Sequence, residues 1–143
     1  MKQITVSVML GAAMTVATAG AGAAAPAGKV DLGKQEYSAN CASCHGLTGK
    51  GDGPTTGYLT KKPADLTVLA KSNGGVLPVS RLYDSIEGDK LPPGHGTREM
   101  PTWGWDYRTR AAEYYVDVPY DTNAYVRTRI LALVDYIERL QVR

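Results

Sequence analysis

The sequence predicts a mostly α-helical domain, and two observations carry this prediction. Apolar residues recur at helical spacing near the end of the chain, at Val126, Ile130, Leu133, Val134 and Ile137. The alternating apolar and polar pattern of half-buried strands is weak everywhere. A length of 143 residues fits one such domain behind a processed N-terminus.

The N-terminal segment, residues 1–25, predicts a secretory signal peptide. Lys2 is its only charge, and an apolar run follows that leads into an Ala/Gly-rich stretch. An uncut membrane anchor is the alternative, but the run is shorter than the ~18–20 residues that cross a bilayer. We expect cleavage after Ala23 or Ala25, a periplasmic location and no stable membrane insertion afterwards.

The first half of the remaining domain, residues 26–143, alternates helix candidates with loops. A short helix is predicted over 31–40, with an aspartate at its start as N-cap. Residues 47–60 are rich in glycine, which predicts a loop. A helix over 63–71 begins with proline, and another over 78–87 ends before a glycine.

The second half begins with an irregular segment and ends with the clearest helix. Residues 90–104 carry several proline and glycine breaks, and residues 108–115 predict only a turn or two of helix. The apolar stripe then marks a long helix that ends near Leu140, and Asp121 to Asn123 offers its N-cap.

The charge balance excludes one class of function. The chain has 16 Lys and Arg against 14 Asp and Glu, and the basic residues are scattered. A nucleic-acid binder needs a concentrated basic face. We therefore expect no nucleic-acid partner.

The chemistry of the chain centres on Cys41-Ala42-Ser43-Cys44-His45. Two thiols at this spacing can form thioethers with the two vinyl groups of one haem, and the histidine that follows can bind the iron. A redox-active dithiol would need a βαβ setting, and a disulfide over so short a loop would stabilise little. Zinc would need four tetrahedral ligands, which the chain offers poorly. The motif predicts one covalent haem c, attached through both cysteines.

A second axial ligand has two candidates, Met100 and His95. Met100 is the only methionine after the signal peptide, and it lies in a polar loop where no apolar face requires it. We expect His45 and Met100 as iron ligands, with His95 or an open position as the alternatives. A thioether favours Fe(II) and raises the reduction potential, and two closed axial positions favour electron transfer over catalysis.

With these residues, the sequence resembles the class I c-type cytochromes of bacteria, of the monohaem cytochrome c-551/552 type. In that family a glycine and an aromatic residue of the first helix pack on a leucine and an aromatic residue of the last. Gly33 and Tyr37 match the first pair, and Leu133 and Tyr136 match the second. The resemblance implies N- and C-terminal helices packed across each other around the haem.

The resemblance also implies roles for single residues. Pro54 is similar to the family's proline whose carbonyl accepts the His45 ring N–H, a bond that would fix the imidazole. Met100-Pro101 matches the family's ligand loop.

The chain departs from compact members of this family between the ligand loop and the last helix. Residues 104–123 form an aromatic-rich insertion. Trp103 N–H or Tyr107 O–H could bind a haem propionate, or the aromatics could form a docking patch. Packing of the insertion against the body is the plainer interpretation.

The sequence therefore predicts a periplasmic electron carrier that is not an enzyme. It would cycle between Fe(III) and Fe(II) and dock transiently on a redox protein donor and acceptor. A tightly bound haem c subunit of a larger periplasmic oxidoreductase is the alternative. A catalytic or gas-sensing role would need an open iron.

Overall fold

The computed structural model describes residues 29–88, 100–117 and 119–142, and this part of the chain is helical. The helices are α1 (Leu32–Asn40), α2 (Ala42–His45), α3 (Val79–Glu87), α4 (Trp103–Tyr114) and α5 (Thr122–Arg139). Between α2 and α3 lie short 3-10 helices at Thr56–Tyr58, Leu66–Val68 and Lys71–Asn73. The mostly α prediction is confirmed. The predicted signal peptide, most of the predicted irregular segment 90–104 and His95 lie outside the described residues.

Capping residues set the limits of the helices as the sequence predicts. The Asp31 carboxylate accepts the backbone N–H of Lys34 at 3.0 Å and begins α1. Asp121 begins α5 by accepting the N–H groups of the second and third residues that follow it. Gly88 ends α3 with a φ of 99°, a left-handed conformation that favours glycine.

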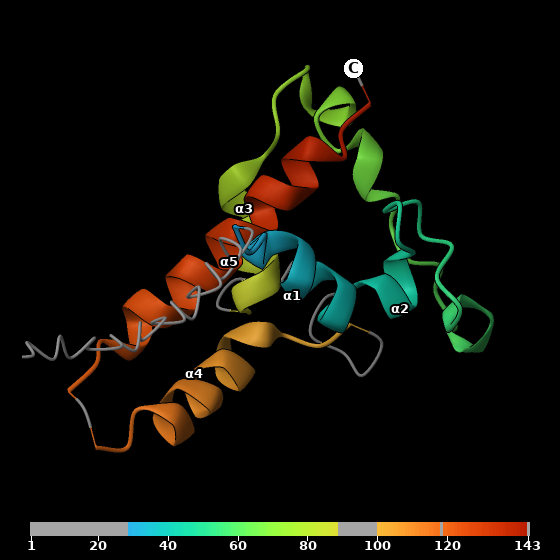
Figure 1. Cartoon of the computed structure of the whole chain (residues 1–143). Coiled ribbons are helices and arrows are strands. Elements are labelled where there is room, and N and C mark those ends of the chain that lie inside the picture. Colours follow the sequence, from blue (N-terminus) through green and yellow to red (C-terminus); the bar gives the residue numbers. More distant parts are fainter. Residues whose placement is uncertain (1–28, 89–99, 118, 143) are drawn as a thin grey trace, which may run out of the picture.

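The first and last helices cross in close contact (Figure 1). At the crossing, a Cβ on Gly33 would run into the backbone carbonyl of Ala132. The rings of Tyr37 and Tyr136 pack at 5.0 Å between centroids, and Leu133 is completely buried. The packing that the family resemblance implies for these four positions is confirmed.

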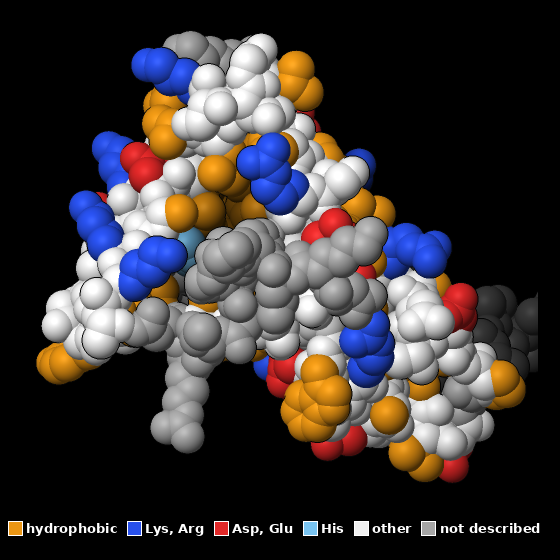
Figure 2. All heavy atoms as spheres, turned by 180° about the vertical axis from the view of Figure 1, so that it is seen from behind, with side chains coloured by type: hydrophobic (Ala, Val, Ile, Leu, Met, Phe, Trp, Pro, Cys, Tyr) orange, Lys and Arg blue, Asp and Glu red, His pale blue; other side chains and the backbone are white. Residues whose placement is uncertain are grey.

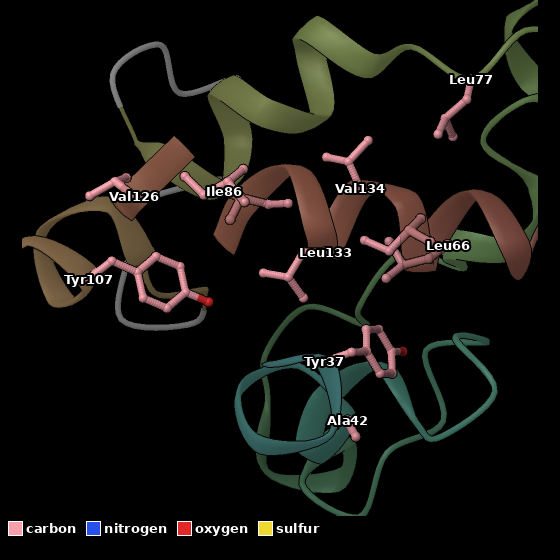
Figure 3. Packing of buried hydrophobic residues seen from close by; sticks show 11 residues of the cluster. Tyr37, Ala42, Leu66, Leu77, Ile86, Tyr107, Val126, Leu133 and Val134 are labelled. Atoms are coloured by element: carbon pink, nitrogen blue, oxygen red, sulfur yellow. The ribbon is translucent and has the colours of Figure 1, made fainter. Parts of the chain in front are cut away.

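The core forms around α5, which contacts α1, α3 and α4. Figure 3 shows buried side chains that converge on α5 from α1, α3, α4 and the segment between α2 and α3. The largest fully buried side chains of this core are Tyr37, Tyr107, Val126, Ile130 and Leu133. This arrangement leaves α2 and the loop after it beside the core.

Two predicted elements are wrong in detail. Instead of a helix over 63–71, the chain makes two separate 3-10 turns. Asp65 causes the first, because its carboxylate accepts both the N–H and the O–H of Thr67. The turn or two of helix predicted over 108–115 is a longer helix, α4, which starts at Trp103.

The start of α4 has a packing explanation. Trp103, Tyr107 and Ala111 recur every four residues and turn one face of the helix inward. Gly104 allows the helix to approach the backbone of Glu87, whose carbonyl a Cβ would strike. Most of the aromatic-rich segment thus belongs to a helix. No helix in the described part of the chain is long and apolar enough to cross a membrane.

Candidate functional site

Helix α2 presents two thiols and an imidazole on a single helical turn. Cys41 is its N-cap, Cys44 lies in it and His45 ends it. The two cysteines form no disulfide with each other, and both are half-buried. Before a haem is attached, burial raises the pKa of the Cys41 thiol to about 12. The Cys44 sulfur lies 3.2 Å from the Thr55 hydroxyl.

The His45 ring is buried and oriented by a backbone carbonyl. Only 9% of the residue is exposed, and its Nδ1 lies 3.0 Å from the carbonyl oxygen of Ala64. Because a carbonyl can only accept, Nδ1 carries the proton in this bond. The lone pair that can bind a metal is therefore on Nε2.

The implied role of Pro54 is wrong, since Ala64 supplies the acceptor. The backbone on either side of Pro54 is bound to α2 itself, through Gly53 N–H to the Cys44 carbonyl and Thr55 N–H to the Ser43 carbonyl, each at 3.0 Å. Further along the chain, the backbone at Pro63 comes back close to Gly51. Gly51 has a φ of 72°, and a Cβ added to it would strike the Pro63 carbonyl. This close approach belongs to the turn that brings Ala64 to the His45 ring.

A cavity of about 210 Å³ lies beside α2, and its lining also includes residues of the segment between α2 and α3 and of the start of α4. Five of the six predicted site residues line it, namely Cys41, Cys44, His45, Met100 and Trp103. Pro54 is not among its lining residues within the described ranges. Met100 thus faces the same cavity as His45, although the two are far apart in sequence. In Figure 2, apolar atoms and a histidine are visible among Lys and Arg side chains on one face of the molecule.

The remaining lining residues are mainly apolar and were missed by sequence reasoning. The apolar ones are Leu59, Pro63, Ala64, Leu66, Leu82, Ile86, Pro101 and Ile137. The polar ones are Asn40, Lys61 and Lys62. Asn40 directly precedes the first cysteine, and this position was the one available sequence signal for it.

Of the alternatives for the aromatic-rich segment, Tyr107 follows packing against the body rather than a hydrogen bond to a propionate. Tyr107 is completely buried, and its O–H donates to the Glu36 carboxylate at 2.9 Å. Its ring packs 6.5 Å from that of Trp103, centroid to centroid. The aromatic side chain of α4 that reaches the cavity is Trp103, with Tyr107 behind it.

The donor set and the walls of this cavity fit a haem. Two thiols and an imidazole stand on one turn, a thioether lines the same space, and the walls are apolar. The two lysines match the negative charge of haem carboxylates.

The comparisons agree with this chemistry. A family model described as Cytochrome c matches residues 30–141. The chain therefore belongs to the cytochrome c family, a family of haem proteins of electron transport. Its Cys41/Cys44 pair is consistent with one covalently bound haem c. No curated protein and no solved structure matches the chain.

Proposed function

We propose that this protein is a periplasmic one-electron carrier whose haem iron is bound by His45 and Met100. The observation that supports this proposal most directly is that both side chains line one cavity together with the two thiols. When bound, the haem supplies a one-electron couple between Fe(III) and Fe(II).

The residues of the chain have separate tasks in this proposal. Cys41 and Cys44 attach the group covalently, which keeps it in an exported protein. His45 offers Nε2 to the iron, while its Nδ1–H bond to Ala64 fixes the ring and increases its basicity. Met100 offers a soft, neutral sulfur from the segment that precedes α4.

The proposed ligand set explains why we propose a carrier that is not an enzyme. With both His45 and Met100 bound to it, the iron would have no free site for a substrate. The apolar walls of the cavity would exclude water from the part of the group that they contact. Within the family, the Gly33 and Tyr37 pattern supports a bacterial class I protein of the cytochrome c-551/552 type. Its partners would be redox proteins that dock transiently.

The test is a redox titration of the protein purified from the periplasm. We expect one haem per chain, one reversible one-electron wave and no rapid carbon monoxide binding to the ferrous form. Rapid binding of carbon monoxide would contradict the closed iron. A protein that always copurifies with a larger oxidoreductase would instead support a permanent haem subunit.

A further inference from the structure

A buried charged cluster lies behind one wall of the cavity. Glu36 of α1 is only 6% exposed. Its Oε2 accepts the Tyr107 O–H and the Asn40 side-chain N–H, each at 2.9 Å. Its Oε1 forms an ion pair with Arg129 of α5. The Arg129 guanidinium also stacks on the ring of Tyr125, 4.5 Å from the ring centroid.

The cluster is one side chain away from the cavity. Asn40, which donates to Glu36, lines the cavity, as does Cys41 directly after it. Tyr107, the other donor, packs against Trp103, which also lines the cavity. The Glu36 carboxylate is therefore connected to the lining of the cavity by two routes, one through Asn40 of α1 and one through Tyr107 and Trp103 of α4.

We propose that the buried Glu36 carboxylate lowers the reduction potential of the site and that its ion-pair partner Arg129 offsets this effect. This inference rests on the proposed one-electron function. Reduction removes one positive charge from the iron, so a nearby negative charge favours the oxidised form and a positive charge favours the reduced form. A buried carboxylate such as Glu36 acts more strongly than an exposed charge, because water screens it less, whereas the partly exposed Arg129 is screened more.

The pair is also a costly feature for a small core to keep. A buried ion pair is weak evidence for stability, since desolvation offsets much of its attraction. Tyr37, Ile130 and Leu133 already supply apolar packing between the same helices. An electrostatic role toward the cavity gives this pair a function that packing alone does not.

The test measures the reduction potential of the haem-loaded protein and five variants. Glu36→Gln removes the negative charge with little change of shape, Arg129→Gln removes the positive charge, and a double variant removes both. Tyr107→Phe removes one hydrogen bond to the carboxylate and leaves its charge in place. Glu113→Gln, on the exposed end of α4, is the control for net charge.

We expect the potential to rise in Glu36→Gln, to fall in Arg129→Gln and to return close to the parent value in the double variant. Tyr107→Phe should lower it slightly, because the carboxylate is then less neutralised. Glu113→Gln should leave it nearly unchanged. If Arg129→Gln yields no haem-loaded protein, the opposite signs expected for Glu36→Gln and Tyr107→Phe decide the question.

Two results would overturn the inference. One is a shift in Glu36→Gln no larger than that in Glu113→Gln. The other is a shift of the same sign in all cluster variants, which would indicate general damage to the cavity wall. Either result with a reversible one-electron wave leaves the proposed function intact, whereas absence of that wave would contradict the function itself.

Discussion

At the scale of single residues, the orientation of His45 depends on a turn more than on another side chain. The acceptor of its ring N–H is the main chain at Ala64, so no side-chain truncation there removes it. The turn needs Gly51, which has positive φ and no room for a Cβ next to the Pro63 carbonyl.

Replacing this glycine should therefore disturb both the fold and the histidine. Gly51→Ala should cost about 1–2 kcal/mol for its left-handed conformation and about 1–3 kcal/mol more for overpacking. Gly74→Ala is the matched control, because Gly74 has a φ of 70° and nothing within 4 Å of its Cβ position. Urea unfolding of the haem-loaded variants measures the difference. Equal losses in the two variants would show that the approach to Pro63 carries no energy.

The site residues differ in how well the sequence revealed them. Cys41, Cys44 and His45 were predicted from local spacing, and Met100 from the absence of any other methionine after the signal peptide. Ala64 was not predicted because a backbone acceptor has no side-chain signature. Its place depends on how a glycine-rich loop closes, and many loops of that length would satisfy the same sequence pattern.

At the scale of helices, α1 and α5 cross with their backbones in close approach. Gly33→Ala should destabilise the protein by about 1–3 kcal/mol, because a methyl group there meets the Ala132 carbonyl, which cannot move alone. Gly57→Ala, in a short 3-10 helix with open space around it, should be neutral or slightly stabilising. The midpoints of urea unfolding test this pair, and a neutral Gly33→Ala would contradict the close crossing.

The same two helices are joined near their ends by Asp31 and Arg139. Hydrogen bonds from Arg139 and from the Lys34 backbone lower the pKa of Asp31 from 3.8 to about 2. The folded carboxyl therefore stays ionised where the unfolded one has taken up a proton. Its stabilising effect is present above about pH 4 and is lost as the pH falls toward about 2.

Asp31→Asn should remove this part of the acid sensitivity. We expect the variant to be less stable than the parent above about pH 4 and the gap to close as the pH falls toward about 2. Thermal unfolding across this range, at fixed low salt, measures the gap. A gap that does not change with pH would mean that Asp31 acts only as a neutral cap.

Helix α4 shows why some elements escaped prediction. Its first residues, Trp103, Gly104 and Trp105, are mediocre or poor helix formers, and prolines and glycines precede them. The helix forms because it buries Tyr107 and Ala111 against the rest of the core. Packing between distant segments thus overrode local preference, whereas α5 was predicted because its stripe and its cap agree.

At the scale of the whole molecule, the proposed role depends on export and on haem attachment in one compartment. The protein recovered from the periplasm should begin at Ala24 or Pro26, and its mass should exceed that of the shortened chain by one haem. Mass spectrometry of the intact protein tests both points at once. An uncleaved chain in the membrane fraction would contradict the signal peptide.

The absorption spectrum of the oxidised protein tests whether His45 and Met100 bind the iron. A methionine sulfur bound to ferric haem gives a weak far-red band, which we expect in the parent protein. Met100→Ala should abolish the band, lower the potential and open the ferrous iron to carbon monoxide. Leu82→Met, elsewhere on the cavity wall, controls for the mere presence of a methionine in the cavity. A band that is absent from the parent, or that persists in Met100→Ala, would contradict this ligation.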